Sequence, residues 1–295
     1  MIKYSTLEGI NVPSTSIALG QFDGIHLGHK AVIKQAVDYA KENNTASVLV
    51  TFKTSPKEYF IKSSEYIFER KDTYCLIEKL GVDYLLELDF ASVVNLSPEE
   101  YLENILLKSF KPISITTGFN HTFGKDKKGT VDYLNINAEK FGYKYFCIEP
   151  VRKEEEIVST TLIKNYLKQG LVYKANDLLT TNFKLVSTVI KGDAIGRTID
   201  FPTANLSYPH GIVKLPYGVY QVLANGKSAV LNWGVKPTLN GKEPVLEVHI
   251  INYSEDLYGK MLVIEFIKRI RDEKKFLSIR ELQEQIKKDV EECLR

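Results

Sequence analysis

The sequence predicts an α/β chain of two domains: an N-terminal domain built on a parallel sheet, and a C-terminal six-stranded antiparallel β-barrel with a terminal helix. Strands and helices alternate through the first two thirds of the chain, which is typical of a parallel sheet with helices on both faces. From about Phe183 the alternation stops, and short apolar segments follow one another with glycine and asparagine turns between them. The 295 residues are enough for a sizeable core in each of two domains, 1–182 and 183–295.

In the first domain, apolar runs and turn signals define the expected elements. Strands are predicted at 17–19, 46–52, 82–88, 113–117 and 143–148. Helices are predicted at 30–43, 70–80, 97–110 and 131–141, and a last helix runs to about Gln169. Ser97 is a strong helix start, because Pro98 occupies the first turn and Glu100 completes a capping box. Ligands of such a sheet bind beyond the carboxyl ends of its strands, so functional motifs are expected there.

In the second domain, strands are predicted at 184–191, 202–206, 218–224, 228–233, 246–252 and 262–268. Asn225-Gly226 between two of them is a two-residue hairpin signal. Six closely spaced strands favour a closed barrel. A terminal helix begins at Ser278, and its apolar stripe is expected to pack on the barrel through Leu282, Ile286 and Val290.

The composition argues against several classes of protein. A net charge of +2 gives no argument for a nucleic-acid or membrane partner. The three cysteines, Cys75, Cys147 and Cys293, lie far apart without a CxxC pair, so neither a disulfide framework nor a structural zinc site is expected, and a reducing cytoplasm fits. No stretch has the order of a signal peptide, and no run of about 18 apolar residues could span a membrane.

The stretch 16–30 is the densest motif of the first domain. It reads as a strand, a short turn and a helix N-terminus, which presents unpaired backbone N–H groups and the positive end of a helix dipole to a phosphate. His26 and His29 are three residues apart, so on a first helical turn they could reach the same phosphate oxygens. The candidate phosphate-binding residues of the turn are Gly20, Phe22, Asp23 and Gly24.

Two other interpretations of this stretch are weaker. The glycines could only make turns, with the histidines as surface polar residues. Zinc is not favoured, because no cysteine or carboxylate lies at ligand spacing. The stretch resembles the GxFDGxHxGH signature of the nucleotidyltransferase superfamily, in the form found in the adenylyltransferase half of bacterial FAD synthetases. This resemblance implies a Rossmann-like domain in which His26 and His29 contact ATP phosphates and stabilise the transition state at the α-phosphorus.

The segment 118–129 follows a predicted strand and resembles the family's GxNFxFG element. The resemblance implies that Asn120 helps to hold the nucleotide and phosphate, and that Phe123 lies near the flavin. Without the resemblance, the segment could equally be a polar glycine loop that ends in a solvated run of charges.

The segment 158–164 reads VSTTLIK and leads into a helix. Hydroxyls at a helix start, with a cation one turn later, make a phosphate-binding set, although a simple helix cap at Ser159 is the alternative. The segment resembles the family pattern ISSTxIR. Alignment on the downstream glycine places Ser159, Thr160 and Thr161 on its hydroxyls and Lys164 on its arginine. Leu162 stands where the family frequently has a further arginine.

The segment 192–206, GDAIGRTIDFPTANL, is the second dense motif. Its glycine-framed loop supplies the phosphate-binding candidates Gly192, Gly196 and Arg197. Thr203 and Asn205 stand at i and i+2 on a strand, so their side chains project to one face. Two neutral oxygen ligands beside ATP phosphates suit Mg²⁺, although an edge-strand turn is the alternative for this tetrapeptide.

The sequence PTAN at 202–205 resembles the signature of riboflavin kinase. Motifs at 232–238, 247–253, 256–259 and 271–276 follow in the order and spacing of that family. The chain is therefore identified as a member of the bacterial bifunctional riboflavin kinase/FAD synthetase family. The resemblance implies that Thr203 and Asn205 hold the metal and phosphates, that Glu247 accepts the proton of the terminal ribityl hydroxyl, and that Arg271 contacts the flavin.

The function that this resemblance implies is Mg²⁺-dependent synthesis of flavin nucleotides in the cytoplasm. The barrel would phosphorylate riboflavin with ATP to FMN, and the first domain would transfer AMP from a second ATP to FMN, giving FAD. One alternative is a riboflavin kinase with a weak or inactive adenylyltransferase half, motivated by Leu162 and Lys164. A second is a non-catalytic flavin or nucleotide sensor, against which the intact histidines and Glu247 argue. The sequence leaves the oligomeric state open.

Overall fold

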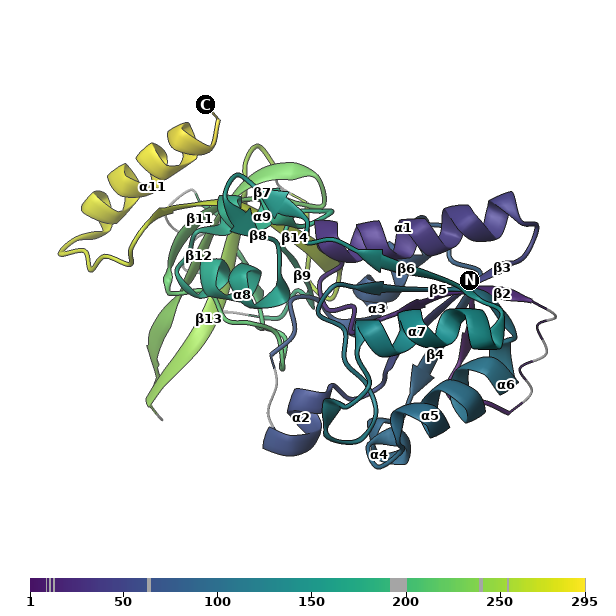
Figure 1. Ribbon diagram of the computed structural model, residues 1–295. Coiled ribbons are helices and arrows are strands. Elements are labelled where there is room, and N and C mark those ends of the chain that lie inside the picture. Colours follow the sequence, from purple (N-terminus) through teal and green to yellow (C-terminus); the bar gives the residue numbers. More distant parts are fainter. Residues whose placement is uncertain are drawn as a thin grey trace. The chain divides into compact units, whose positions relative to one another are not determined.

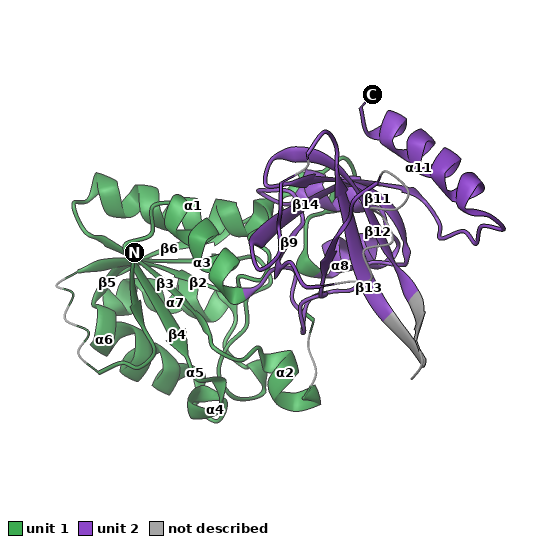
Figure 2. Cartoon of the chain, turned by 180° about the vertical axis from the view of Figure 1, so that it is seen from behind, with its two compact units in different colours: residues 1–65, 70–160 green, residues 66–69, 161–295 purple. Residues whose placement is uncertain are grey.

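The structure is a computed structural model that describes residues 1–8, 10, 12, 14–62, 65–191, 201–238, 241–253 and 255–294, with the side chains of 236–238 and 241–243 left aside. The chain divides into two compact units (Figures 1 and 2). Unit 1 comprises Met1–Glu65 and Arg70–Thr160, and unit 2 comprises Tyr66–Glu69 and Thr161–Arg295.

Unit 1 is built on a six-stranded sheet in the order β1-β4-β3-β2-β5-β6, and every neighbouring pair is parallel. The chain moves from β2 toward one edge through β3 and β4, and then returns to the other side of β2 with β5 and β6. The strand order therefore reverses between β2 and β5, and the ligand crevice of an open α/β sheet lies at such a point. The strands are β1 (Ile2–Tyr4), β2 (Thr15–Leu19), β3 (Ala46–Phe52), β4 (Tyr84–Leu88), β5 (Pro112–Gly118) and β6 (Lys144–Ile148).

Helices cover both faces of this sheet, as Figure 1 shows. One apolar core joins Ile33 of α1 (Leu27–Glu42) and Ile77 of α3 (Arg70–Lys79) to Leu49 of β3. The opposite core joins Val48 and Val50 of β3 to a helical stretch with a π-helical middle and to α7 (Val131–Phe141). That stretch consists of α5 (Pro98–Glu100), η1 (Tyr101–Leu107) and α6 (Lys108–Phe110). The alternation of strand residues between two cores explains why the strands are apolar on both faces.

Short elements complete unit 1. They are α2 (Pro56–Ile61), α4 (Phe90–Val93), the 3₁₀ turn η2 (Lys125–Lys127) and the hairpin of β7 (Arg152–Lys153) with β8 (Glu156–Ile157). The sequence does not predict these elements or β1, because segments of two to six residues are too short to show a period.

Unit 2 is a six-stranded antiparallel sheet in the order β10-β13-β12-β11-β14-β9. A bridge from Ile190 to Asn205 links the two ends of this order, so the sheet is a nearly closed barrel. Asn225 and Gly226 both have positive φ, +47° and +79°, as the predicted hairpin turn requires. The strands are β9 (Lys184–Thr188), β10 (Ala204–Leu206), β11 (Gly218–Ala224), β12 (Lys227–Thr238), β13 (Gly241–Ile250) and β14 (Met261–Arg271).

Among the residues that the structure describes, three helices accompany the barrel: α8 (Thr160–Lys168), α9 (Val172–Leu178) and α11 (Ile279–Cys293). The Asn176 side chain on α9 donates to the carbonyl oxygen of Phe266 at 2.8 Å and accepts from the N–H of Phe183 at 2.7 Å. Helix α9, which the sequence does not predict, is therefore part of unit 2. The long segment of unit 2 begins at Thr161. A kinase domain that begins at residue 183 stays a prediction.

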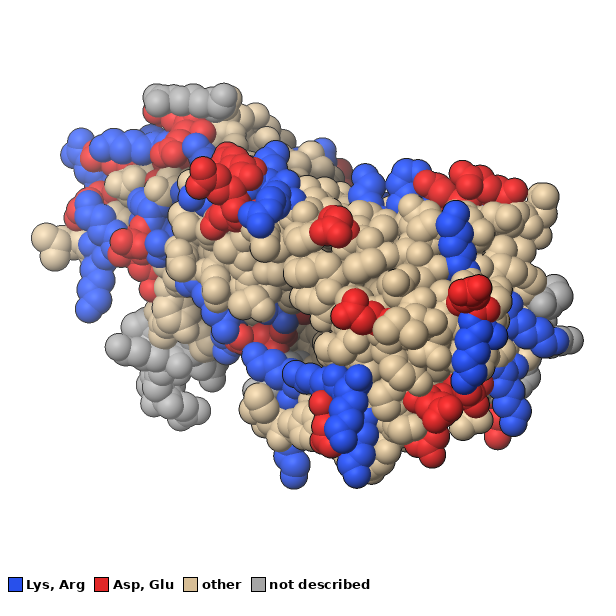
Figure 3. All heavy atoms as spheres, viewed as in Figure 1, with Lys and Arg blue, Asp and Glu red and all other residues tan. Residues whose placement is uncertain are grey.

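The fold class predicted from the sequence is confirmed in both halves. Ser278 caps α11 as predicted, with the N–H of Glu281 donating to Ser278 Oγ at 3.2 Å. Of the predicted stripe, Val290 packs on the barrel cluster of Val219 and Val230, while Leu282 and Ile286 are half-buried. Strands β12 and β13 are longer than the predicted segments, since β12 continues to Thr238 and β13 begins at Gly241. On the face shown in Figure 3, acidic and basic side chains are interspersed. Within the described ranges, no helix combines the length and apolarity needed to cross a membrane.

Candidate active sites

The loop between β2 and α1 has a fixed and strained shape. Gly24 has φ +83° and Ile25 has φ +42°, a left-handed conformation that a β-branched residue rarely adopts. The Ile25 side chain is fully buried in the core beneath α1, which holds the strained backbone in place. A Cβ on Gly20 would lie 2.9 Å from Cζ of Phe22, so the phenyl ring lies directly against the glycine. Such strain is concentrated at functional sites, and here it sets the direction in which His26 leaves the loop.

His26 and His29 meet at the start of α1. His26 is the N-cap residue, and its Nδ1 accepts a hydrogen bond from the backbone N–H of His29 at 3.2 Å. The two imidazole rings stack with centroids 3.6 Å apart and an interplanar angle of 19°. The ring of Phe22 meets His29 edge-on at 5.2 Å. A Cβ on Gly28 would lie 3.1 Å from Cε1 of His26, so the glycine leaves room for the ring. The predicted pairing of the histidines on one helical turn is confirmed in this geometry.

Burial controls the charge of the pair. Burial lowers the pKa of His26 to about 4. Burial, and then the neighbouring charge of His26, hold the pKa of His29 well below 6.5. Both rings are therefore neutral near pH 7, and Nδ1 of His29 is enclosed without a partner among the described residues. Neutral ring N–H groups beside the positive end of α1 can donate to phosphate oxygens.

The loop after β5 leaves the same edge of the sheet, because β5 is the parallel neighbour of β2. Asn120 is exposed there. Phe123 is only 6% exposed and packs against Tyr101 and Tyr133, so its ring anchors the loop. His121 lies against Phe123, with ring centroids 5.9 Å apart and its Nε2 buried without a partner in the described structure. Burial lowers the pKa of His121 to about 4. The sequence pattern alone does not predict a role for His121, which stands where the family element GxNFxFG has its first phenylalanine.

The residues predicted to bind phosphate at 159–164 are divided between the two units. In unit 1, Oγ1 of Thr160 lies 3.5 Å from the carbonyl oxygen of Asp23, which brings this segment to the loop after β2. Ser159 immediately precedes α8 in the same unit. Thr161 and Lys164 belong to unit 2, where the Lys164 ammonium lies 5.9 Å from the ring centroid of Tyr66.

In the barrel, strand register places Glu247 between two carboxamides. Asn205 of β10 is its direct partner on one side, and Asn232 of β12 is its partner on the other. Directly opposed residues share one face, with Cβ atoms about 4.5–5.5 Å apart. The neighbouring Leu246 and Val248 are buried on the interior face, so this polar row lies on the other face. In the sequence, Asn232 is only the first residue of the motif at 232–238, because one sequence does not show which residues pair across strands.

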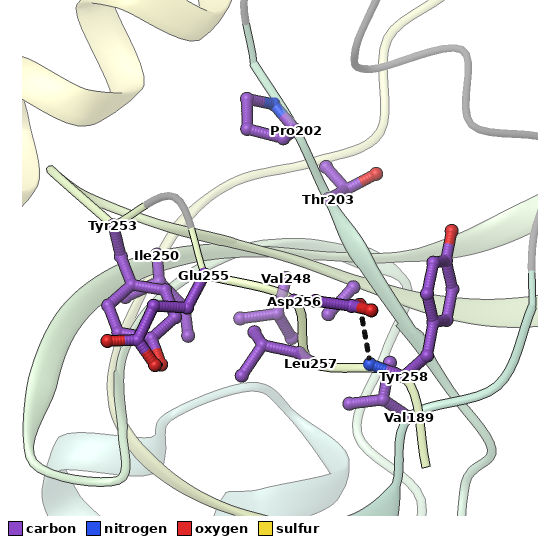
Figure 4. Close-up of a pocket in the computed structure, with 11 residues that line it drawn as sticks. Val189, Pro202, Thr203, Val248, Ile250, Tyr253, Glu255, Asp256, Leu257 and Tyr258 are labelled. Carbon is purple, nitrogen blue, oxygen red and sulfur yellow. Dashed lines mark hydrogen bonds between the residues drawn. The ribbon is translucent and has the colours of Figure 1, made fainter. Parts of the chain in front are cut away.

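A cavity of about 500 Å³ adjoins the PTAN segment. Thr203 and Pro202 line it, together with Val248 of β13 and the loop of Asp256 and Tyr258 (Figure 4). The Asp256 carboxylate accepts from the N–H of Tyr258 at 3.1 Å. The structure therefore places Thr203 at the cavity and buries Asn205, 6% exposed, in the row beside Glu247.

Other contacts fix the surroundings of this row. Nδ1 of His249 donates to the carbonyl oxygen of Pro202 at 2.9 Å, which ties the PTAN segment to β13. Arg271 is engaged with α11, because its Nε lies 3.0 Å from Oδ1 and its Nη2 2.7 Å from Oδ2 of Asp289. The flavin contact expected of Arg271 stays a prediction. The remaining predicted phosphate-binding residues lie outside the described residues; they are Gly192, Gly196 and Arg197.

Comparisons with known proteins assign each half to a class. Residues 10–162 match the model of the FAD synthetase family, and residues 179–295 match the model of the riboflavin kinase family. The chain thus combines an FAD synthetase domain with a riboflavin kinase domain.

Relatives with known names match over nearly the whole chain. The bifunctional riboflavin kinase/FMN adenylyltransferase of Bacillus subtilis is 35% identical over 95% of this chain and 91% of that protein. The protein of the same name from Haemophilus influenzae is 32% identical over 94% and 92%. A crystal structure described as a macrolide-efflux protein from Streptococcus pneumoniae matches with a TM-score of 0.89 and 31% identity, covering 100% of this chain and 98% of that chain. The chain belongs to the bifunctional riboflavin kinase/FMN adenylyltransferase family.

Proposed function

We propose that this chain makes FMN and FAD by two successive reactions with ATP. In the first, riboflavin takes the γ-phosphoryl group of ATP to give FMN and ADP. In the second, FMN takes AMP from another ATP to give FAD and pyrophosphate. The observation that carries the proposal is that one chain holds both a stacked histidine pair at a helix N-terminus and a carboxylate between two carboxamides in a barrel.

For the adenylyl transfer, the loop after β2 supplies the phosphate site. His26 and His29 donate ring N–H groups to the phosphate oxygens that gain charge as FMN attacks the α-phosphorus. Backbone N–H groups of the first turn of α1 add to this binding, since they have no partner within the helix. Ser159 and Thr160, which belong to the same unit as this loop, bind the outgoing pyrophosphate in this proposal. The loop of Asn120 and Phe123 holds the nucleotide and the flavin.

For the phosphorylation, Glu247 is the base. Its carboxylate accepts the proton of the terminal ribityl hydroxyl as the oxygen attacks the γ-phosphorus of ATP. Asn205 and Asn232 flank this carboxylate in register and can hold it, or the hydroxyl, by hydrogen bonds.

Mg²⁺ is part of the proposed barrel site. Thr203 and Asn205 offer neutral oxygens, which fit an ion that keeps several waters and takes few protein ligands. In the described ranges, no three His, Cys, Asp or Glu side chains gather as a metal site. When bound, the ion neutralises charge on the transferring phosphoryl group.

A cytoplasmic location belongs to the same proposal. Both reactions consume ATP, and Cys75, Cys147 and Cys293 are free thiols, as a reducing compartment requires. The substrates and products are riboflavin, FMN, FAD and ATP.

Product analysis by chromatography tests the function. The purified chain is incubated with ATP and Mg²⁺ and with either riboflavin or FMN. We expect FMN and FAD from riboflavin, and FAD from FMN. FMN alone from riboflavin, with nothing formed from FMN, would refute the adenylyltransferase half.

A further inference from the structure

We propose that Glu273 is a second carboxylate of the riboflavin site in unit 2, where it accepts a hydrogen bond from an N–H or O–H group of riboflavin. Arg271 and Asp289 are the positioning residues that hold it there. This inference rests on the proposed riboflavin kinase function. It gives Arg271 a role through Asp289 in place of the expected flavin contact.

Strand register extends the polar row of Glu247 across the barrel. Asn232 of β12 has Glu247 as its partner on one side and Val219 of β11 on the other. Arg271 of β14 is in turn the partner of Val219. Val219 is only 3% exposed, because it packs in one apolar cluster with Val290 of α11. Helix α11 is therefore a wall beside Asn232.

The carboxylate of Glu273 lies on this face of the barrel. Gly234 follows Asn232 by two residues on β12, so the two residues share a face and are about 7 Å apart. A Cβ on Gly234 would overlap Oε1 of Glu273 and would lie 3.4 Å from Nδ2 of Asn232. The same Oε1 accepts from the N–H of Val235 at 3.3 Å. The missing side chain of Gly234 thus leaves room for a carboxylate beside the row.

A buried ion pair fixes the start of the loop that carries Glu273. Nε of Arg271 lies 3.0 Å from Oδ1 of Asp289, and Nη2 lies 2.7 Å from Oδ2. Asp289 is only 3% exposed and also accepts from the amide of Gln285 at 2.9 Å. Nη1 of Arg271 donates to the carbonyl oxygen of Asp272 at 3.0 Å, one residue before Glu273. A paired, planar contact fixes orientation as well as distance, so Arg271 holds both α11 and this loop.

The chemistry of the two substrates gives a second carboxylate a use. A carboxylate accepts hydrogen bonds, and riboflavin offers it donors in the N–H of its ring and in its ribityl hydroxyls. The phosphate groups of ATP carry negative charge and are repelled by it. Glu273 therefore distinguishes the flavin from the nucleotide on this side of Asn232, while Glu247 takes the terminal hydroxyl.

Two substitutions test the binding role. Glu273→Gln keeps an oxygen for the N–H of Val235 and removes the charge of the acceptor. We expect it to raise the Michaelis constant for riboflavin about tenfold and to change kcat less than about twofold, as loss of a binding contact does. Gly234→Ala should have the same effect, because its Cβ displaces the carboxylate. FAD formation from FMN is the internal control.

Two further variants test the positioning role. Asp289→Asn weakens the paired contact with Arg271 and should also raise the Michaelis constant for riboflavin. Arg271→Asp combined with Asp289→Arg should lower this constant again. Glu292→Gln is the matched control, because the pair of Lys268 and Glu292 also joins β14 to α11, at 3.1 Å, but is exposed. A constant raised equally by Glu292→Gln would contradict the positioning role.

Flavin analogues identify the donor. Lumiflavin has the ring N–H but no ribityl chain, and 3-methyllumiflavin has neither donor. Binding of both, and of riboflavin, to wild type and Glu273→Gln is measured by quenching of flavin fluorescence. If the ring donates, the variant binds riboflavin and lumiflavin more weakly but 3-methyllumiflavin equally well. If a ribityl hydroxyl donates, only riboflavin binds more weakly.

Equal Michaelis constants for riboflavin in wild type and Glu273→Gln would overturn the proposal. An equal loss of affinity for all three flavins would overturn it too, because such a loss does not depend on a donor. If wild type does not phosphorylate riboflavin, the proposed function fails. The affinities of wild type and Glu273→Gln for riboflavin still decide the role of Glu273 in that case.

Discussion

The two sites are built from opposite kinds of structure. In unit 1, His26 and His29 lie three residues apart, and one turn of helix brings their rings into contact. In the barrel, Asn205, Asn232 and Glu247 come from three different strands and meet only through register. The first site depends on the local backbone, and the second depends on long-range pairing. A local site depends only on its own loop and helix. A site formed by residues paired across strands is lost when the strand pairing shifts by one residue.

The difference also appears in the charge of the working groups. Burial keeps both rings of the histidine pair neutral, so the role proposed for them is to donate N–H groups. Glu247 is half-buried on the outer face of the barrel and is the proposed proton acceptor. Each site can therefore be removed by a change that leaves the shape of the other untouched.

Removal of the barrel base should have the largest effect. Glu247→Gln keeps the shape and one acceptor but removes the basic carboxylate, so riboflavin phosphorylation should fall about 10²–10⁴-fold. FAD formation from supplied FMN should not change. Initial rates at saturating riboflavin and Mg·ATP measure the effect. Glu265→Gln is a matched control, because Glu265 is a strand carboxylate of β14 that accepts from Asn182. Near-normal phosphorylation by Glu247→Gln would remove the base from the mechanism.

Removal of one donor from the histidine pair should have the next largest effect. His29→Ala should lower FAD formation from FMN about 10²–10³-fold, the usual loss for one preorganised donor, and leave riboflavin phosphorylation near normal. Rates of the two reactions on one preparation measure this. His210→Ala replaces an exposed histidine and serves as the control. A parallel fall in both activities would indicate a folding defect instead of a lost contact.

Truncation tests where the barrel unit begins. A chain that starts at Thr181 loses α9, and with it the buried side chains of Val172 and Leu178 and both hydrogen bonds of Asn176. Burial of each such apolar side chain is worth about 1.5–3 kcal/mol, so the thermal midpoint should fall by about 10 °C or more relative to a chain that starts at Thr161.

Both truncated chains also lack residues 66–69, of which Phe68 stacks on Phe183 with ring centroids 6.2 Å apart. Both should be less stable than the barrel in the full chain, as fluorescence of Trp233 during heating would show. Equal midpoints for the two truncated chains would mean that α9 adds nothing, and the predicted boundary after residue 182 would then be favoured.

The buried rings make the stability of unit 1 depend on pH. The folded pKa of His26 is about 4, against 6.5 for an ordinary histidine, so unfolding takes up a proton between these values. The free energy of unfolding should be constant above pH 6.5 and fall as the pH drops toward 4, by up to about 1.4 kcal/mol per pH unit for each ring. Hydrogen exchange of the α1 amides between pH 7.5 and 5 measures this change in the free energy of unfolding. His121→Phe removes another buried ring of low pKa, so it should reduce the slope of the unfolding free energy against pH. A free energy of unfolding that does not change with pH would refute the prediction.

The smallest effect concerns Lys164. An ammonium cannot make the paired, planar contact of a guanidinium with phosphate. Lys164→Arg should therefore lower the Michaelis constant for ATP in FAD formation by about fivefold. This factor corresponds to about 1 kcal/mol from the added hydrogen bond. The constant for ATP in riboflavin phosphorylation is the internal control. An increased constant would show that this position requires a lysine.

The same contrast explains what the sequence could predict. The loop and helix of the histidine pair are local, so the apolar run, the glycine turn and the histidine spacing are enough to locate them. The alternation of strands and helices likewise predicts the parallel sheet. The partnership of Asn232 with Glu247 and the ion pair of Arg271 with Asp289 each join residues far apart in the chain. Nothing in a local pattern specifies such contacts, since they depend on register and packing.

Two structural features were missed for a related reason. Residues 66–69 belong to unit 2 although they lie within the sequence of unit 1. Helix α9 is only seven residues long, which is too short to show a clear period, and its place is fixed by the tertiary bonds of Asn176. The predicted boundary between the domains was drawn where the sequence pattern changes, whereas compactness depends on these packing contacts.

The central claim is that two separate sites share one chain, and mixing two inactivated proteins tests it most directly. Glu247→Gln and His29→Ala are incubated alone and together with riboflavin, ATP and Mg²⁺, and FAD is measured by chromatography. Glu247→Gln alone should make almost no FAD, and His29→Ala alone should accumulate FMN. The mixture should form FAD, because FMN released by one protein is the substrate of the other. A mixture that accumulates FMN without forming FAD would contradict the claim.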